Sequence, residues 1–236
     1  MRTVKRGRPS YDSERGLSRE AILDASLGLI DEVGLDKFSI RLLAQRMRVF
    51  PAAIYWHLST RNALLAATLN HCLSDTMPNT EPDDWKAWLT ALFRENRRVV
   101  QRHPNITPLI TSQLLSNAGA NFKLVDRTLE VLETAGFKGA KLFAAYDIVI
   151  TATLGFVTME FAALPSEDTK GWTRLMRQTV EGLDEKSYPH IHRHKAALTN
   201  KHFILRWENG ATLPLDASFE AYVYTIIEGL RQLLTR

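Results

Sequence analysis

Two short amphipathic segments, separated by a turn of three to four residues, constrain the fold of this chain more than any other feature. Ser39 is a suitable N-cap for a first helix over residues 40–47, and Pro51 suits the first turn of a second helix that ends near Leu58. Ile54 and Leu58 form the inner edge of this second helix. Two short helices joined in this way are typical of a helix-turn-helix.

Helical spacing extends over the rest of the chain. Apolar residues recur every three to four positions from the N-cap candidate Ser18 to Gly34, which predicts a helix in front of the pair. Further predicted helices cover residues 62–77, 83–101, a short piece after His103-Pro104, 120–135, 140–164 and 217–235. We therefore predict an all-α fold, with an N-terminal three-helix helix-turn-helix domain followed by a helical bundle.

Positive charge is concentrated in the first third of the chain. Residues 1–74 contain 11 Lys and Arg against 7 Asp and Glu, whereas residues 75–236 contain 19 of each sign. An excess of this kind favours contact with a polyanion such as nucleic acid, although a solvated basic surface is an alternative. Arg6 and Arg8 flank Gly7 in a basic arm over residues 1–17, a pattern that suits insertion into a narrow minor groove.

The second short helix leaves a set of aromatic and small residues at its outer side. Exposed aromatic residues are costly unless something covers them, and the major groove of DNA can do so. The outward or edge positions are Pro51, Ala52, Ala53, Tyr55, Trp56 and His57. Tyr55 and His57 can bond phosphates, Ala52 and Trp56 can contact thymine methyl groups, and Arg61 can clamp a further phosphate. The alternative is an ordinary three-helix domain that uses these aromatic residues as its core.

Residues 18–74 resemble the DNA-binding domain of the tetracycline-repressor (TetR) family of bacterial transcriptional regulators. The resemblance rests on Phe38-Ser39-Ile40-Arg41-Leu42-Leu43-Ala44-Gln45-Arg46-Met47, Val49, Ala53-Ile54-Tyr55-Trp56-His57-Leu58, Arg61 and Leu64-Leu65. It implies that Ser39, Arg41, Tyr55 and Arg61 contact the DNA backbone. It also implies that Pro51, Ala52, Trp56 and His57 lie at or near the bases. Two residues depart from the family pattern: Arg48 stands where glycine is common, and Phe50 replaces a small polar cap.

Residues 75–236 have the pattern of a regulatory bundle that binds a ligand and dimerises. The last predicted helix has a wide apolar stripe that needs a partner, and the resemblance to the family, carried here by residues 84–89 and this helix, implies pairing of the last helices of two subunits. The residues predicted to dimerise are Tyr222, Val223, Ile226, Ile227 and Leu230. The alternative is that the stripe serves only the core of its own chain.

The effector is predicted to be small and largely hydrophobic, because apolar and aromatic residues with a few polar ones line such sites. Candidate contacts, for each of which the pattern favours a core position over a contact, are Trp88, Phe122, Phe143, Tyr146, Thr153, Phe156 and Glu160. A tetracycline–magnesium site is not expected, because the segment after His103-Pro104 lacks the histidine that the resemblance would require.

Four histidines, at positions 190, 192, 194 and 202, raise the alternative of a zinc site. Alternate histidines converge on a strand but diverge on a helix, and no cysteine or clear carboxylate partner is near. We therefore expect no metal, and we interpret residues 184–215 as an insertion or loop with an irregular or hairpin-like stretch near 202–210.

Several other classes of protein are disfavoured. The single cysteine, Cys72, cannot form an internal disulfide, which indicates a reducing compartment such as the cytoplasm. The most apolar stretch, residues 143–164, carries Asp147 and Glu160, so no membrane span is predicted. No glycine-rich phosphate loop, Gly-x-Ser-x-Gly or His-Glu-x-x-His motif is present, so we expect neither an enzyme nor a cofactor.

The sequence therefore predicts a homodimeric repressor that binds a palindromic operator and is released by a small effector. Its predicted parts are a basic arm (1–17), a DNA-binding domain (18–74) and a regulatory domain (75–236). A DNA-binding protein without effector control and a helical-bundle enzyme are the alternatives.

Overall fold

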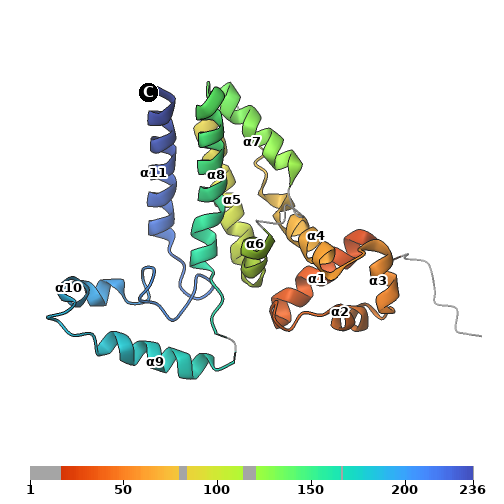
Figure 1. Ribbon diagram of the computed structural model, residues 1–236, viewed down its shortest axis with the longest axis horizontal. Coiled ribbons are helices and arrows are strands. Elements are labelled where there is room, and N and C mark those ends of the chain that lie inside the picture. Colours follow the sequence, from red (N-terminus) through yellow and green to blue (C-terminus); the bar gives the residue numbers. More distant parts are fainter. Residues whose placement is uncertain (1–16, 80–83, 114–120, 166, 236) are drawn as a thin grey trace, which may run out of the picture.

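The computed structural model describes residues 17–79, 84–113, 121–165 and 167–235 (Figure 1). Over these residues every regular element is helical and none is a strand, which confirms the predicted all-α fold. The helices are α1 (Arg19–Val33), α2 (Ile40–Met47), α3 (Pro51–His57), α4 (Arg61–Leu73), α5 (Trp85–Arg102), α6 (Thr107–Gln113), α7 (Phe122–Thr134), α8 (Gly139–Glu160), α9 (Thr169–Glu181), α10 (Pro189–Leu198) and α11 (Asp216–Thr235). Short 3₁₀ turns, η1 (Ser74–Thr76) and η2 (Pro104–Ile106), follow α4 and α5.

Side-chain caps set the boundaries of the first helices. The Ser18 hydroxyl accepts a hydrogen bond from the Ala21 amide (3.1 Å) at the start of α1, and the Ser39 hydroxyl accepts one from the Leu42 amide (3.2 Å) at the start of α2. Helix α1 ends at Gly34, whose φ of 78° lies where glycine carries no steric cost. The predicted ends of these two helices are thus confirmed.

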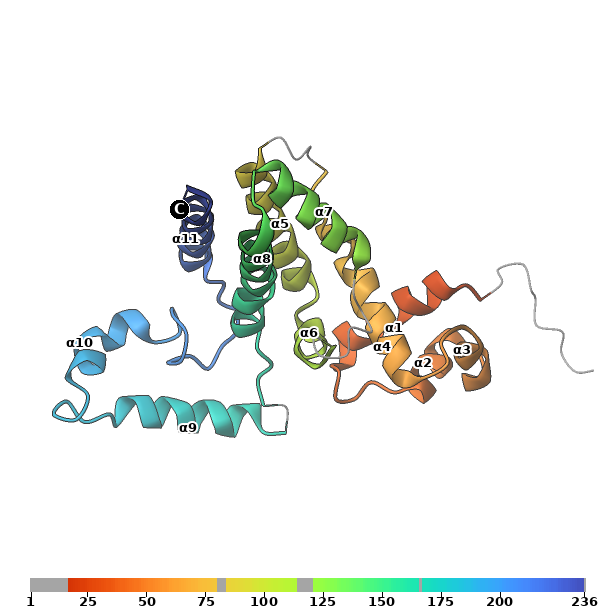
Figure 2. The ribbon, with the colours of Figure 1, turned by 45° about the horizontal axis from the view of Figure 1, so that its top comes forward.

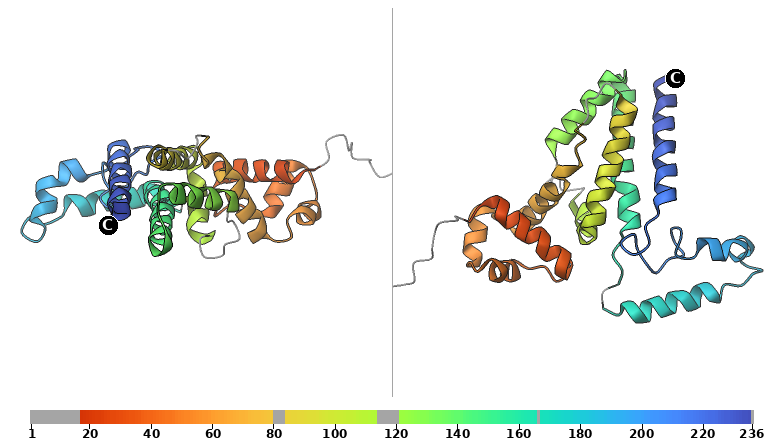
Figure 3. Two further views of the ribbon diagram at one scale, coloured as in Figure 1. Left: turned by 90° about the horizontal axis from the view of Figure 1, so that it is seen from above. Right: turned by 180° about the vertical axis from the view of Figure 1, so that it is seen from behind.

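The molecule is elongated, with its bundle in the middle. Helices α5, α7, α8 and α11 form the bundle, the head (residues 18–74, with α1 to α4) lies at one end of the long axis, and α9 and α10 lie at the other (Figures 1 and 3). Figure 2 shows the same separation after rotation, with α6 between the bundle and the head. The head meets the bundle where α1 packs against η2 and where α4 packs against α5 and α6.

Two hydrophobic clusters organise the interior. The bundle core is centred on Trp88, Phe93, Phe156 and Phe219. The basal core contains the inner residues of the head and also residues from the C-terminal end of α5, from η2, from α6 and from the end of α8, among them Val100, Ile106, Leu109 and Phe161. Packing therefore crosses the boundary predicted between residues 74 and 75, so the head shares its core with the bundle.

Polar contacts join the head and the bundle at the C-terminal end of α1. The His103 Nδ1 lies 2.7 Å from the Asp31 Oδ2, and the Asn105 side-chain amide donates to the backbone carbonyls of Ile30 (3.2 Å) and Asp31 (2.9 Å). The Ile30 carbonyl also accepts from the Gly34 backbone amide (2.8 Å), whereas the Asp31 carbonyl is one that a helix end leaves without an intrahelical partner. The end of α1 is therefore tied to the segment that follows α5.

Helix α8 is apolar nearly all round. By length and composition alone it could cross a membrane, contrary to the sequence prediction, although the core helix of a soluble protein has the same properties. In the bundle α8 packs against α5, α7 and α11. Phe143 (63% exposed) and Met159 (55% exposed) remain on its uncovered side. Its interior position explains part of its apolar character.

The region between α8 and α11 differs from the sequence prediction. Helix α9 was not predicted, and α10 lies where a loop was expected, so His190, His192 and His194 are on a helix and diverge. No hairpin forms near residues 202–210, which are irregular. Among the described residues no three His, Cys, Asp or Glu side chains come close enough to hold a metal ion.

The apolar stripe of α11 is used mostly within its own chain. Val223, Ile227 and Leu230 are buried against the bundle, so the prediction that these three contact a partner subunit is corrected. Tyr222 and Ile226 are only partly buried and lie at the edge of the bundle core. The sequence revealed the stripe, but α5 and α8 cover its centre.

Candidate nucleic-acid interface and effector region

The turn between α2 and α3 is closed by backbone bonds. Arg48 takes the left-handed conformation (φ 56°, ψ 40°), its amide donates to the Gln45 carbonyl (3.2 Å), and the Val49 amide donates to the Ala44 carbonyl (3.0 Å). A residue other than glycine in this conformation costs about 1 kcal/mol. Arg48 therefore makes the tight turn that glycine would make at no steric cost, and the spacing of the two helices is kept.

Helix α3 divides sharply into buried and exposed positions. Ile54 is fully buried and Leu58 is 5% exposed, whereas Trp56 is 83% exposed and Tyr55 is 44% exposed. The predicted inner and outer positions are thus confirmed. Pro51 and Ala52 are exposed as well, and the half-buried His57 ring meets the Trp56 ring edge-on, with centroids 4.8 Å apart. The aromatic residues are not the core of the head, so they remain available to a ligand of the head.

Polar and cationic side chains surround this aromatic surface. Ser39 and Arg41 at the start of α2 and Arg61 at the start of α4 are exposed, and the Arg61 guanidinium lies 6.0 Å from the centre of the Phe38 ring. Arg6 and Arg8 fall outside the described residues. An aromatic face bordered by hydroxyl and guanidinium groups has the chemistry of a nucleic-acid interface, in which cations and hydroxyls meet phosphates and flat apolar groups meet bases.

Cys72, the single cysteine, is buried on α4. Burial, with a smaller contribution from the nearby Asp31 carboxylate, raises the pKa of its thiol to about 12. Because the thiolate is the nucleophile, a thiol held protonated in this way is unsuited to nucleophilic chemistry.

The seven predicted effector contacts are not brought together. Trp88 and Thr153 are buried in the bundle, Phe122 (77% exposed) and Phe143 (63% exposed) lie on its outside, and Tyr146 is partly buried. Thr153 already has partners, since its hydroxyl donates to the Val149 carbonyl (2.7 Å) and its carbonyl accepts from the Asn96 side-chain amide on α5 (2.6 Å). These side chains therefore do not form one site.

Glu160 is part of a buried ion pair. Its two oxygens accept bonds from the Arg97 Nε (2.8 Å) and Nη2 (2.7 Å), and Oε1 also accepts from the Leu215 amide (2.7 Å). Arg97 reaches Asp216 as well (2.8 Å), and the hydrogen bond to Glu160 is the main reason that the pKa of Arg97 is raised. The prediction that Glu160 contacts an effector is corrected, because its carboxylate already joins α5, α8 and the start of α11.

Phe156 does line a hollow. This hollow has a volume of about 490 Å³ and lies between α8 and α11, with almost wholly apolar walls. The Phe156 ring is 5.3 Å, centre to centre, from the rings of Phe203, Phe219 and Tyr222. Its lining residues are Thr151, Gly155, Phe156, Met159, Phe203, Ser218, Ala221, Tyr222 and Thr225. The hollow could hold a flat apolar molecule beside a few hydroxyl groups.

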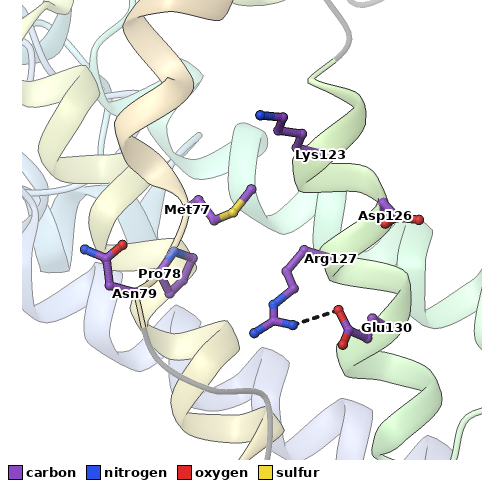
Figure 4. A pocket seen from close by; sticks show the side chains of 7 residues that line it. All are labelled: Met77, Pro78, Asn79, Lys123, Asp126, Arg127 and Glu130. Atoms are coloured by element: carbon purple, nitrogen blue, oxygen red, sulfur yellow. Dashed lines mark hydrogen bonds and ion pairs between the residues drawn. The ribbon is translucent and has the colours of Figure 1, made fainter.

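A second hollow of about 420 Å³ is more polar and lies between α7 and the segment that follows η1 (Figure 4). The Arg127 Nη1 and the Glu130 Oε2, both on α7, form an ion pair of 2.7 Å on its wall. Its lining residues are Met77, Pro78, Asn79, Lys123, Asp126, Arg127 and Glu130. Equal numbers of cationic and anionic side chains give this hollow no preference for a charged ligand.

Sequence reasoning missed Phe203 and the contact of His103 with Asp31. Phe203 lies in the segment read as an insertion, where no periodicity assigns a direction to a side chain. His103 and Asp31 are separated by 72 positions, so no local pattern links them. The aromatic character of residues 202–207 was a usable signal, whereas the histidine–carboxylate pair had none.

Comparison with protein families gives two matches that together cover most of the chain. Residues 22–68 match the family described as "Bacterial regulatory proteins, tetR family", and residues 77–234 match "Tetracyclin repressor-like, C-terminal domain". The first match contains α2 and α3, and the second contains the bundle together with α9 and α10.

Individual relatives agree with these matches. The chain is 30% identical over 147 residues to an HTH-type transcriptional regulator of Saccharopolyspora erythraea, covering 61% of each protein. It is 27% identical over 180 residues to the class A tetracycline repressor protein from transposon 1721 of Escherichia coli, covering 72% of this chain and 82% of that one. The structure of the Streptomyces coelicolor TetR family protein ActR in complex with actinorhodin matches with a TM-score of 0.68 and 23% identity, covering 93% of this chain and 99% of that one. This last likeness is one of fold.

Proposed function

The chain belongs to the tetracycline-repressor family of bacterial regulatory proteins, and from this premise we propose that it is a homodimeric repressor that leaves its operator when a small effector binds. Family membership makes it a DNA-binding transcriptional regulator and not an enzyme. The proposal adds four features to family membership: a dimer, a palindromic operator, an effector and a cytoplasmic location.

One observation carries the DNA-binding part: the outer face of α3 presents Trp56 and Tyr55 to solvent while Ile54 holds the helix in the head. A recognition helix lies in the major groove in just this way, with its inner edge packed and its outer face against base edges. We assign Pro51, Ala52, Trp56 and His57 to the vicinity of the bases. The backbone contacts are assigned to Ser39, Arg41, Tyr55 and Arg61, with Arg6 and Arg8 in the adjacent minor groove.

A dimer is required because one short helix reads too few base pairs. Two heads separated by about 34–36 Å read two half-sites on one face of the duplex. Exposed apolar side chains beside the apolar hollow support an interface there, namely Ile148 and Met159 on α8, with the partly buried Tyr222 and Ile226 of α11 next to them. Val223, Ile227 and Leu230 would support this interface from beneath.

Effector control is supported by the apolar hollow beside Phe156 and by the shared basal core. A ligand that binds better to one arrangement of the bundle shifts the population of head positions by its difference in affinity. The contact of His103 with Asp31 gives such a shift a direct route to α1. The related ActR structure contains actinorhodin, which supports an aromatic small molecule as effector here.

The proposal is tested first by binding to duplex DNA. Operators are selected from a random pool, and affinity is measured by fluorescence anisotropy between 50 and 200 mM KCl, over which it should fall by about 10³-fold or more. Trp56→Ala should weaken binding to the selected duplex by about 10-fold or more and change non-specific binding little. Leu175→Ala, which removes an exposed side chain on α9, is the control and should bind normally. Equal losses of specific and non-specific binding in Trp56→Ala would contradict its place near the bases.

The arm and the effector need separate measurements. Removal of residues 1–9 should weaken operator binding while sedimentation still shows a dimer. A screen of hydrophobic compounds should find one that releases the operator. If none does, the chain is a DNA-binding protein without effector control, an alternative that the dispersed positions of Phe122, Phe143 and Trp88 favour. Sedimentation as single subunits at micromolar concentration would overturn the dimer.

A further inference from the structure

Phe50 occupies the N-cap position of α3, where the chemistry of helix ends disfavours it. Its backbone is extended (φ −79°, ψ 145°), no side chain caps α3, and the ring is 84% exposed. The other three helices of the head begin at Ser18, Ser39 and Thr60, each of which accepts a bond from a backbone amide of the first turn. Within the described head, Phe50 alone departs from this pattern.

This residue is unfavourable for the stability of the free protein in two ways. A phenylalanine at the N-cap cannot accept a hydrogen bond from the first turn, as Ser, Thr, Asp or Asn would. Hydrophobic burial does not stabilise the exposed ring either, because the adjacent Val49, and not Phe50, packs against the core of the head. A residue that violates both the N-cap preference and the burial of aromatic rings is typical of a functional position.

The position of Phe50 indicates what covers its ring. The N-terminal residues of a recognition helix meet base edges in the major groove. A phenyl ring offers no conventional hydrogen-bonding group, and the apolar group that distinguishes one base pair from the others in that groove is the C5-methyl of thymine. We propose that Phe50 is a specificity-determining residue that packs on the methyl group of one thymine in each half-site. This inference rests on the proposed DNA-binding function.

Phe50 and Trp56 would contact different base pairs. Six positions along α3 correspond to about 9 Å, whereas successive base pairs are about 3.4 Å apart. Removing a methyl group beneath Phe50 should therefore leave the contacts of Trp56 intact. This separation allows the thymine that Phe50 reads to be identified by scanning one base position at a time.

The test combines a change in the DNA with a change in the protein. Each thymine of the selected operator is replaced in turn, in both half-sites together, by deoxyuridine, which lacks only the methyl group. The wild-type protein should lose about 10-fold in affinity at one such position, since each half-site uncovers one methyl group. Phe50→Ala should bind the unmodified operator about 10-fold more weakly and should lose less than about 2-fold on the same replacement.

Two further variants separate recognition from folding. Phe50→Ser supplies the missing N-cap oxygen, so its melting temperature should be no lower than that of the wild type while the methyl dependence disappears. Tyr188→Ala is the matched control, because Tyr188 is also an aromatic N-cap without a capping bond and precedes Pro189, but lies on α10. It should keep the full methyl dependence of the wild type.

The outcomes distinguish the two proposals. If the wild-type protein binds no duplex, both the repressor function and the role of Phe50 are overturned. If the protein binds its operator but Phe50→Ala and Phe50→Ser retain the methyl dependence at every thymine, the role of Phe50 alone is overturned. The role of Phe50 alone is also overturned if deoxyuridine leaves the affinity of the wild-type protein unchanged at every position.

Discussion

The head and the segment between α8 and α11 are of similar length, yet they hold their helices in opposite ways. The head packs α1 to α4 around fully buried residues such as Ile22, Leu43 and Ile54. In residues 161–215, by contrast, α9 buries only Val180 and α10 buries no residue. Packing against neighbouring helices thus stabilises even the short α2 and α3, whereas the longer α9 and α10 bury few side chains.

The contacts that hold residues 161–215 are few: Phe161, Phe203 and Leu215 pack on the two cores, and the others are polar or aromatic. The Gly210 amide donates to the Glu160 carbonyl (2.7 Å), and a Cβ at Gly210 would lie 2.5 Å from the Glu160 Cγ, so only glycine allows this approach. The Arg177 guanidinium lies 5.4 Å from the centre of the Trp207 ring. The comparison teaches that the position of residues 161–215 depends on their contacts around Glu160, whereas the stability of the head depends on hydrophobic burial.

The largest expected effect comes from removing the charge of the Glu160 side chain, which binds Arg97 and the Leu215 amide where residues 161–215 meet the bundle. Glu160→Gln leaves the Arg97 guanidinium buried without its main counter-charge, so the free energy of unfolding should fall by about 3–5 kcal/mol. Urea denaturation measures this fall. The control is Glu220→Gln, which breaks the exposed pair with Arg94 (2.6 Å) and should cost less than about 1 kcal/mol. Similar losses in the two variants would mean that the buried pair of Glu160 and Arg97 contributes no more than a surface pair.

The second effect compares the same side-chain deletion in the two regions. Leu43→Ala removes a fully buried side chain of the head and should lower the free energy of unfolding by about 3 kcal/mol. Leu175→Ala on α9 removes a side chain that is 63% exposed and should change it by less than about 0.5 kcal/mol. A large fall in the free energy of unfolding for Leu175→Ala at micromolar protein concentration would show that this face of α9 is buried in solution.

The third and smallest effect is a pH dependence of the head. Because the folded pKa of Cys72 is about 12 against an ordinary value of 9.0, the buried thiol stabilises the fold fully below pH 9. Between pH 9 and 12 only the unfolded chain releases the proton, so this stability is lost as the pH rises. Between pH 8.5 and 10.5 the wild type should lose about 2 kcal/mol more than Cys72→Ala, measured by urea denaturation. Parallel losses in the two proteins would exclude this role for the thiol.

Much of the head could be predicted from the sequence because its signals are local. Ser18, Ser39 and Gly34 mark helix ends through bonds to residues three or four positions away, and the inner positions Ile54 and Leu58 follow from helical spacing. Helix α9 has comparable local signals in its Asp168 cap and in the spacing of its apolar residues, so the sequence contains the information that predicts it as well.

The effector region could not be predicted in the same way. Trp88, Phe122 and Phe143 are all apolar and all helical, but their exposure ranges from none to 77% because it depends on which helix packs opposite each residue. Glu160 looks like an available carboxylate in the sequence, and only its contact with Arg97, 63 positions away, shows that it is not.

By itself the sequence determined the helices of the head and of the bundle, where the first ones begin and end, and which face of each is apolar, since these depend on neighbours within a few positions. The tertiary structure decided which apolar faces are covered by the chain itself, as for Val223 on α11, and which are left open, as for Trp56 on α3. The physical reason is that hydrophobic burial has no direction of its own, so a stripe specifies that a helix needs a partner without specifying which one.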